Sequence, residues 1–223
     1  MEKVFIQGNL EDKYHTKNPI SQLLMKNFIK TFLKQLDLLE RSQIHTICEI
    51  GCGEGELLKL VHNVFPDAQL YACDISPEVI DKAKRNCSDF AVTFSTQNAQ
   101  KLSSYVDNQF DLVVCCEVLE HLQIPEQGLQ ELSRISSNNL LLSVPIEPLW
   151  SALNMLRGKY LHSFGNTPGH MNHWTPLSFN KFIWKYFSSS SLIHLYPLPW
   201  QMKLIRKINI SKYPFNFDDL ITN

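Results

Sequence analysis

The stretch Glu49-Ile50-Gly51-Cys52-Gly53-Glu54-Gly55 decides the fold, because it places three of the chain's 8 glycines within five residues. It ends an apolar run, residues 44–50, that predicts a β-strand, and it precedes a predicted helix over residues 57–65. Glycine has no Cβ, so it adopts positive φ and lets a ligand approach the backbone closely. A glycine-rich turn between strand and helix therefore predicts a small-molecule cradle at a helix N-terminus.

Predicted strands and helices alternate on both sides of this turn. Further strands are predicted over residues 69–75, 92–95, 110–116 and 139–144, and helices over 78–87 and 126–135. Ser76-Pro77-Glu78 is a typical helix start, with a serine cap followed by proline. Residues 110–116 are apolar almost throughout, as expected of a strand covered on both faces. The alternation predicts a parallel sheet with helical crossovers.

The two ends of the chain complete this plan. Asn18-Pro19 opens a predicted amphipathic helix before the first strand, and Pro176 starts another that runs through residue 187. Residues 191–196 and 200–208 predict two late strands, and the intervening Pro197-Leu198-Pro199 turn is too short for a helical crossover. We therefore expect a doubly wound, mostly parallel seven-stranded α/β sheet, with helices on both faces and an antiparallel last strand.

Four parts follow from this pattern. Residues 1–43 form an N-terminal helical cap, 44–145 the α/β core, 146–174 a lid or substrate loop, and 175–223 the completion of the sheet with a weakly specified tail. The 146–174 segment has prolines and glycines and no clean period, apart from a short helix predicted near residues 150–157. A loop of this length in a compact domain is usually functional or disordered.

Composition narrows the class of protein. The chain has 223 residues, 44% of them hydrophobic and 19% charged, which suits one globular domain with an elaboration. The net charge of −1 indicates no strong field for nucleic acid or for an anionic membrane. None of the six cysteines forms a CxxC pair, so we interpret them as buried free thiols in a reducing compartment. With no signal peptide and no apolar run of membrane-spanning length, a cytoplasmic enzyme is expected.

The spacing of the glycines separates the possible ligands. A dinucleotide fingerprint needs Gly-x-Gly-x-x-Gly, whereas the third glycine here arrives one residue early, at Gly55. A P-loop is excluded because no Gly-Lys-Ser/Thr follows. Four features over residues 44–145 together resemble the class I S-adenosylmethionine-dependent methyltransferases. They are the acid-x-Gly-x-Gly-x-Gly pattern from Glu49, Asp74 after the second strand, Asn98-Ala99, and the run from Phe110 to Leu122.

This resemblance implies a set of cofactor-binding residues. Asp74 would accept hydrogen bonds from both ribose hydroxyls, Asn98 and Ala99 would lie at the adenine edge, and Cys116 and Glu117 beside the methionine part. Relatives often carry Asp where this chain has Asn98, and an amide also supports an adenine contact. The full expected set is Glu49, Gly51, Cys52, Gly53, Gly55, Asp74, Ile75, Asn98, Ala99 and Cys116.

Glu117, Glu120 and His121 form a Glu-x-x-Glu-His motif after the fourth strand, and on a helical turn they would share one face. Ubiquinone-pathway O-methyltransferases and small-RNA 2′-O-methyltransferases have a similar motif that holds a metal. In the second group a later histidine completes the site, and His173 is the best match here. Mg²⁺ or another divalent cation on Glu117, Glu120, His121 and His173 would be a Lewis acid. The alternatives are a general-base or orienting histidine, with His121, His173 and Glu117 as candidate catalytic residues, or a purely structural role.

The resemblance implies methyl transfer to a small-molecule acceptor, most readily a hydroxyl, with an amine or a carbon as the next candidates. The main alternative is an RNA 2′-O-methyltransferase, which the near-neutral charge and the lack of a basic stripe disfavour. A non-catalytic binding protein, and decarboxylation on the same fold, are further alternatives. The sequence identifies neither the acceptor nor the oligomeric state.

Overall fold

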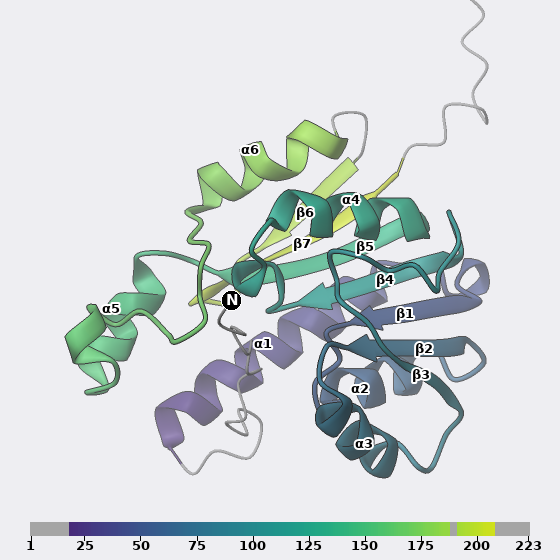
Figure 1. Ribbon diagram of the computed structural model, residues 1–223, viewed down its shortest axis with the longest axis horizontal. Helices are drawn as coiled ribbons and strands as arrows, with labels where there is room; N and C mark the ends of the chain where they lie inside the picture. Colours follow the sequence, from purple (N-terminus) through teal and green to yellow (C-terminus); the bar gives the residue numbers. More distant parts are fainter. Residues whose placement is uncertain (1–17, 188–190, 208–223) are drawn as a thin grey trace, which may run out of the picture.

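The computed structural model describes residues 18–187 and 191–207. The first 17 residues of the expected cap and the expected tail beyond residue 207 therefore lie outside the described residues. Within the described part the chain forms a seven-stranded sheet with helices on both faces (Figure 1). The strand order is β3-β2-β1-β4-β5-β7-β6. The division of the chain into four parts remains a prediction.

The strands confirm the predicted fold class. Strands β1 to β5 pair in parallel, and β7 runs antiparallel between β5 and β6. In the middle of the sheet, Cys48 of β1 is level with Tyr71 of β2 and with Val113 of β4. The bounds are β1 Thr46–Ile50, β2 Gln69–Asp74, β3 Val92–Thr96, β4 Phe110–Cys116, β5 Ser136–Pro145, β6 Ser191–Leu195 and β7 Trp200–Arg206.

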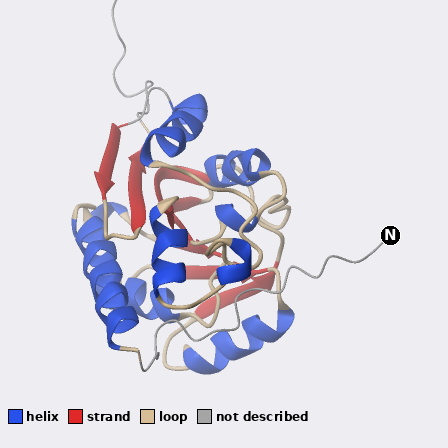
Figure 2. Ribbon diagram, turned by 90° about the vertical axis from the view of Figure 1, so that its left-hand side faces the viewer, coloured by secondary structure: helices blue, strands red, loops and turns tan. Residues whose placement is uncertain are grey.

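Two helical layers enclose the sheet (Figure 2). Helices α1 (Pro19–Asp37), α2 (Glu56–Val64) and α3 (Pro77–Asn86) share one apolar cluster with one face of the sheet. Helices α4 (Pro125–Ile135) and α6 (Pro176–Phe187) share a second cluster with the other face. Because β1 and β4 lie at the centre of both clusters, most of their side chains are buried, which explains their continuous apolar sequence.

Local signals account for where the helices begin. The side chain of Asn18 accepts hydrogen bonds from the backbone N–H groups of Ile20 and Ser21, so it caps α1. The hydroxyl of Ser76 accepts from the N–H of Val79 and caps α3, as its sequence predicts. Helix α5 (Leu149–Leu156) lies within the 146–174 segment, close to the helix predicted there.

Some features differ from the sequence-based prediction. Strand β5 is longer than the predicted 139–144, because α4 leads directly into it at Ser136. Three 3₁₀ turns were not predicted: η1 (Arg41–Gln43), η2 (Leu119–His121) and η3 (Leu161–Ser163). Each has three residues, too few for a periodic pattern. None of the helices in the described ranges is both long enough and apolar enough to cross a membrane.

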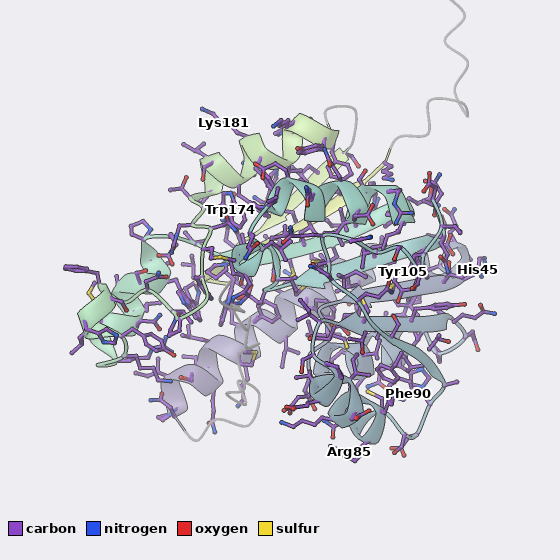
Figure 3. All side chains as sticks on the ribbon, viewed as in Figure 1. His45, Arg85, Phe90, Tyr105, Trp174 and Lys181 are labelled. Carbon is purple, nitrogen blue, oxygen red and sulfur yellow. The ribbon has the colours of Figure 1, made fainter. Side chains whose placement is uncertain are left out.

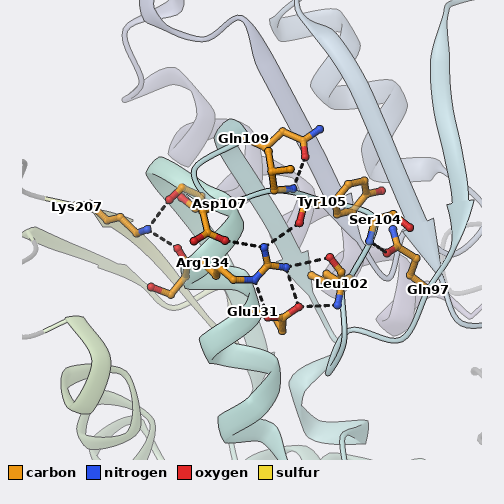
Figure 4. Close-up of polar contacts among 12 residues, drawn as sticks. Gln97, Leu102, Ser104, Tyr105, Asp107, Gln109, Glu131, Arg134 and Lys207 are labelled. Carbon is orange, nitrogen blue, oxygen red and sulfur yellow. Dashed lines mark hydrogen bonds and ion pairs between the residues drawn. The ribbon is translucent and has the colours of Figure 1, made fainter.

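Arg134 at the end of α4 anchors the long connection between β3 and β4 (Figure 4). Its guanidinium donates to the carbonyl oxygens of Leu102 (3.0 Å) and Tyr105 (2.8 Å), and to the carboxylates of Asp107 (2.9 Å) and Glu131 (2.8 Å). Glu131 in turn accepts from the N–H of Leu102 at 2.6 Å. These ion pairs raise the pKa of Arg134 and lower the pKa of Glu131. The connection that carries Asn98 and Ala99 is thus fixed to α4.

We expect Arg134→Met to lower the free energy of unfolding by about 2 kcal/mol, since two backbone carbonyls and Glu131 lose a charged donor. The control is Arg41→Met, because Arg41 pairs with Asp37 on an exposed helix end and such pairs contribute less than about 0.5 kcal/mol. Urea unfolding followed by circular dichroism measures both variants. Equal losses in the two variants would contradict the anchoring role of Arg134.

Candidate active site

The glycine turn between β1 and α2 has three residues with positive φ: Gly51 (+73°), Gly53 (+53°) and Gly55 (+85°). A Cβ on Gly51 would lie 2.2 Å from Cγ2 of Val118, and one on Gly55 would lie 2.6 Å from the sulfur of Cys87. A Cβ on Gly53 would meet no atom within 4 Å. Two glycines therefore permit close packing beneath the turn, while Gly53 faces open space and is the position at which a ligand can approach the backbone.

Asp74, at the end of β2, is hydrogen-bonded to the glycine turn. One carboxylate oxygen accepts from the N–H of Gly53 (3.1 Å), and the other accepts from the N–H of Ser76 (3.0 Å). Each oxygen of an ionised carboxylate has a second acceptor site, so both can also accept hydrogen bonds from a diol. Asp74 is half-buried and lies beside the open face of Gly53, where its sequence position predicts it.

Next to Asp74 the structure places an apolar surface and a polar edge. Ile75 is 42% exposed, which is unusual for isoleucine and leaves an apolar face beside the carboxylate. The N–H of Gln97 donates to the carbonyl of Asp74 (3.0 Å), which holds the end of β3 against the end of β2. Ala99 is buried, and the exposed Asn98 accepts from the N–H of Gln100 (2.9 Å). These residues therefore surround one side of the turn.

Glu49, in β1 two residues before Gly51, lies inside the protein. It is buried, and its Oε2 atom has no hydrogen-bond partner among the described residues. Burial raises the pKa of this carboxyl well above its usual range, and the neighbouring charge of Asp74 raises it further. A buried carboxylate of this kind fits a ligand that brings a positive charge or an N–H donor.

The chain after β4 turns sharply at Glu117, which has a φ of +60°. Its carboxylate accepts from the hydroxyl of Ser143 (2.9 Å) and from the indole N–H of Trp200 (2.7 Å). The preceding Cys116 is buried. Both oxygens of Glu117 are thus held by β5 and β7, at the edge of the sheet where the parallel strands end.

Glu120, His121 and His170 form a compact group, and their potential ligand atoms all lie within 4.8 Å of one another. Glu120 and His170 are buried, and the rings of His121 and His170 meet edge to face. His121 Nδ1 lies 3.0 Å from the carbonyl oxygen of Gly169, so Nδ1 carries the proton and Nε2 is the basic nitrogen. The group has the composition of a divalent cation site.

The predicted metal ligands are therefore only partly brought together. Glu120 and His121 belong to this group, whereas Glu117 and His173 do not. Glu117 is held by Ser143 and Trp200, and Nε2 of the exposed His173 lies 2.9 Å from Oδ1 of Asn166. His170, which precedes His173 by three residues, is the histidine that joins the group. The segment expected from the resemblance thus lies next to the motif, but its buried histidine is His170 and not His173.

Aromatic side chains line the region between this group and α1. Trp150 of α5 stacks over His170 and packs against Trp200, whose ring meets the edge of Phe28. The indole N–H of Trp150 donates to Thr167 (2.9 Å), which fixes the ring. Sequence reasoning missed Ser143 and Trp200 as parts of the site, because each follows ordinary strand patterning and only the fold brings them to Glu117.

Residues 48–141 match the family described as "Methyltransferase domain". Over these residues, about two fifths of its length, the chain is similar to that methyltransferase family. A malonyl-[acyl-carrier protein] O-methyltransferase of Anoxybacillus flavithermus is 36% identical over 89 residues, which are 40% of this chain and 34% of that protein. A ubiquinone biosynthesis O-methyltransferase of Xanthomonas campestris pv. campestris is 31% identical over 81 residues, 35% of this chain and 33% of the relative.

The fold has a structural counterpart as well. The crystal structure of magnesium protoporphyrin IX methyltransferase from Synechocystis PCC 6803 with bound SAH superimposes with a TM-score of 0.64, at 17% identity, covering 91% of both chains. This likeness concerns the fold alone. The chain spans about a third of the length of the curated relatives it matches.

We expect Asp74→Ala to weaken S-adenosylmethionine binding more than tenfold, about 1.4 kcal/mol, because two charge-assisted hydrogen bonds to the ribose are lost. Titration calorimetry measures the dissociation constant. Asp111→Ala is the matched control, since Asp111 accepts from the N–H groups of His45 and Thr46 at the opposite end of the sheet. An unchanged dissociation constant in the Asp74 variant would refute the ribose assignment.

We expect S-adenosylmethionine binding to release a proton from Glu49, because a cationic amine favours the ionised carboxylate whose pKa is raised in the free protein. Affinity should therefore rise with pH. Calorimetry in buffers of different ionisation enthalpy measures the number of protons released. In Glu49→Gln the proton release should disappear and the affinity should fall roughly tenfold. Proton release that persists in this variant would assign it to another group.

Proposed function

We propose that the protein transfers a methyl group from S-adenosylmethionine to a hydroxyl oxygen of a small-molecule acceptor. The observation that carries this proposal is a pair of neighbouring carboxyl groups at the glycine turn: Asp74, which accepts from the N–H of Gly53, and the buried Glu49, whose Oε2 atom has no partner among the described residues. A nucleoside with a diol and a cationic amino acid end complements this arrangement. The names of the two curated relatives, both O-methyltransferases, favour oxygen as the methylated atom.

Each of the expected cofactor-binding residues, which together form the cofactor half of the site, has a defined role in this proposal. Asp74 binds the ribose hydroxyls, and Glu49 holds the amino group, so the donor lies in one orientation. Ile75 and Ala99 provide apolar contacts for the adenine, with Asn98 at its polar edge. Gly51, Cys52, Gly53 and Gly55 shape the backbone, and Cys116 lies next to the methionine part. S-adenosylmethionine supplies an electrophilic methyl group on a sulfonium.

The acceptor half is proposed to lie between the Glu120–His121–His170 group and the aromatic side chains. Trp150 and Trp200 would hold an apolar or planar acceptor and exclude water. The acceptor hydroxyl must lose its proton when the new carbon–oxygen bond forms. Nε2 of His121 can accept that proton, since Nδ1 donates to Gly169. Positioning of donor and acceptor would supply most of the rate acceleration.

A divalent cation is a second proposal for the same group. Glu120, His121 and His170 offer one carboxylate and two imidazole ligands within 4.8 Å of one another, a donor set that suits Mn²⁺, Fe²⁺ or Zn²⁺ better than Mg²⁺. The Gly169 carbonyl would then be the outer partner that orients His121. A bound cation would lower the pKa of the acceptor hydroxyl. Glu117 and His173, expected as ligands from the sequence, are not in this group.

The deciding experiment incubates the protein with methyl-labelled S-adenosylmethionine and a panel of hydroxylated, carboxylated and amine acceptors, with and without EDTA. We expect labelled oxygen-methylated product. Label appearing only in RNA would favour the 2′-O-methyltransferase alternative, and absence of cofactor binding by calorimetry would favour a non-catalytic scaffold.

The cation proposal predicts that EDTA lowers the rate at least tenfold, that Mn²⁺ restores it, and that His170→Asn abolishes the restoration. The matched control is His162→Asn, an exposed histidine in the same segment that lies outside the group. A rate unaffected by EDTA, with a tenfold or greater loss in His121→Asn, would instead assign His121 as the base.

A further inference from the structure

Five of the fifteen exposed large apolar side chains in the described residues lie on two short segments. In α5 and the following η3 turn, Leu156 is 83%, Phe164 82% and Leu161 60% exposed. At the start of α1, Leu23 is 68% and Ile20 56% exposed. Single exposed leucines are common in proteins, but five such side chains on two short segments need an explanation.

These two segments lie together. The guanidinium of Arg157, at the end of α5, lies 3.4 Å from the hydroxyl of Ser21 in α1 and donates a hydrogen bond to it. Figure 1 shows α5 and the first turns of α1 on the same side of the molecule, away from β3 and α3. We define the apolar tip as Ile20, Leu23, Leu156, Leu161 and Phe164.

The backbone of this region directs side chains outward at a conformational cost. Tyr160 and Phe164, which flank η3, both have left-handed backbone angles, with φ of +55° and +51°. Bulky residues rarely adopt this region. The chain reverses there without burying Phe164, and the next residue, Gly165, admits no Cβ because one would lie 2.0 Å from the carbonyl oxygen of Ser151.

Basic residues lie on the same two segments as the apolar tip. Residues 148–217 contain no Asp or Glu, and neither do residues 18–36. Four of the basic residues in these ranges lie on or next to the segments of the tip: Lys26, Lys30, Arg157 and Lys159. Lys26 and Lys30 are exposed on the same face of α1 as Leu23, and Lys159 is exposed between α5 and η3. Lys181 points away from the sheet on α6 (Figure 3).

We propose that the apolar tip and its basic surroundings dock the protein on an anionic phospholipid bilayer. Exposed leucine and phenylalanine enter the headgroup boundary while lysine and arginine meet the lipid phosphates, the combination typical of interfacial binding. A nucleic acid would be attracted by the positive charge, but its phosphate backbone offers no apolar surface to bury the exposed leucine side chains. The inner side of α5 carries Trp150, so docking would bring the candidate acceptor region next to the bilayer.

The test is vesicle flotation of the full chain, which needs no methyl transfer and so stands apart from the proposed function. We expect binding to vesicles of phosphatidylcholine and phosphatidylglycerol (3:1), weak binding to phosphatidylcholine alone, and loss of binding in high salt. Leu156→Ser with Phe164→Ser should weaken binding more than tenfold. Lys26→Glu with Lys30→Glu should remove the preference for anionic lipid.

Matched controls lie at the other end of the molecule. Val106→Ser changes an apolar side chain that is 68% exposed and follows Tyr105, far from α5 (Figure 3), and Arg85→Glu reverses a charge on α3. Both controls should bind vesicles like the unmodified protein. Three results would overturn the proposal: no flotation with either vesicle, equal losses in the tip and control variants, or a dimer in sedimentation velocity that the tip variant dissociates while vesicle binding is unchanged.

Discussion

The carbonyl oxygen of Cys73 accepts two hydrogen bonds, from the N–H groups of Gly51 (2.8 Å) and Cys52 (3.0 Å), and the rest of the site depends on this joint. It fastens the exit of β1 to the end of β2 at the edge where the parallel strands finish. The next residue, Asp74, continues the joint by accepting from Gly53 and Ser76. The dipeptide Cys73-Asp74 therefore holds both the glycine turn and the start of α3, and these bonds set the position of the Asp74 carboxylate.

The joint also couples the cofactor half to the acceptor half. Gly51 can adopt its left-handed φ because it has no Cβ. The side chain of Val118 occupies the space where that Cβ would lie. Val118 follows Glu117, whose carboxylate is held by Ser143 from β5 and by Trp200 from β7. A change at the turn would thus be transmitted to η2 and to the Glu120–His121–His170 group. The antiparallel register supports this arrangement, because it pairs Trp200 with Pro145, at the site end of the sheet.

Much of the fold could be predicted from the sequence because its signals are local. The apolar runs, the glycine cluster and the Ser76-Pro77 cap specify elements within a few residues, and the short turn at residues 197–199 predicts the antiparallel pair. Side-chain partners across the sheet could not be predicted in this way. Lys203 appears in the sequence as an ordinary strand lysine. In the structure Lys203 is buried, its ammonium group contacts His194 and the hydroxyl of Tyr196, and burial lowers its pKa to about 8.

His170 and His173 likewise show that long-range contacts could not be predicted from local sequence signals. The family resemblance implies that a later histidine, His173, joins the Glu-x-x-Glu-His motif; in the structure His170, three residues earlier, lies with Glu120 and His121. Which histidine reaches the motif depends on the N–H groups of Met171 and Asn172, which both donate to the carbonyl of Glu120. These bonds hold the segment so that His170 is buried and His173 is exposed. No periodic pattern in the sequence encodes that choice.

Charge shows most clearly what a whole-chain average conceals. Salt screens the field of exposed charges beyond the Debye length, about 8 Å at physiological ionic strength, so the net charge of −1 says little about what a local surface attracts. A surface acts on a bilayer at shorter range, where only local charges count. The acids of this chain lie mostly before residue 148, so the 146–174 segment can combine two functions. Its inner side supplies Trp150 and His170 to the candidate site, while its outer side presents the exposed Leu156, Phe164 and Lys159.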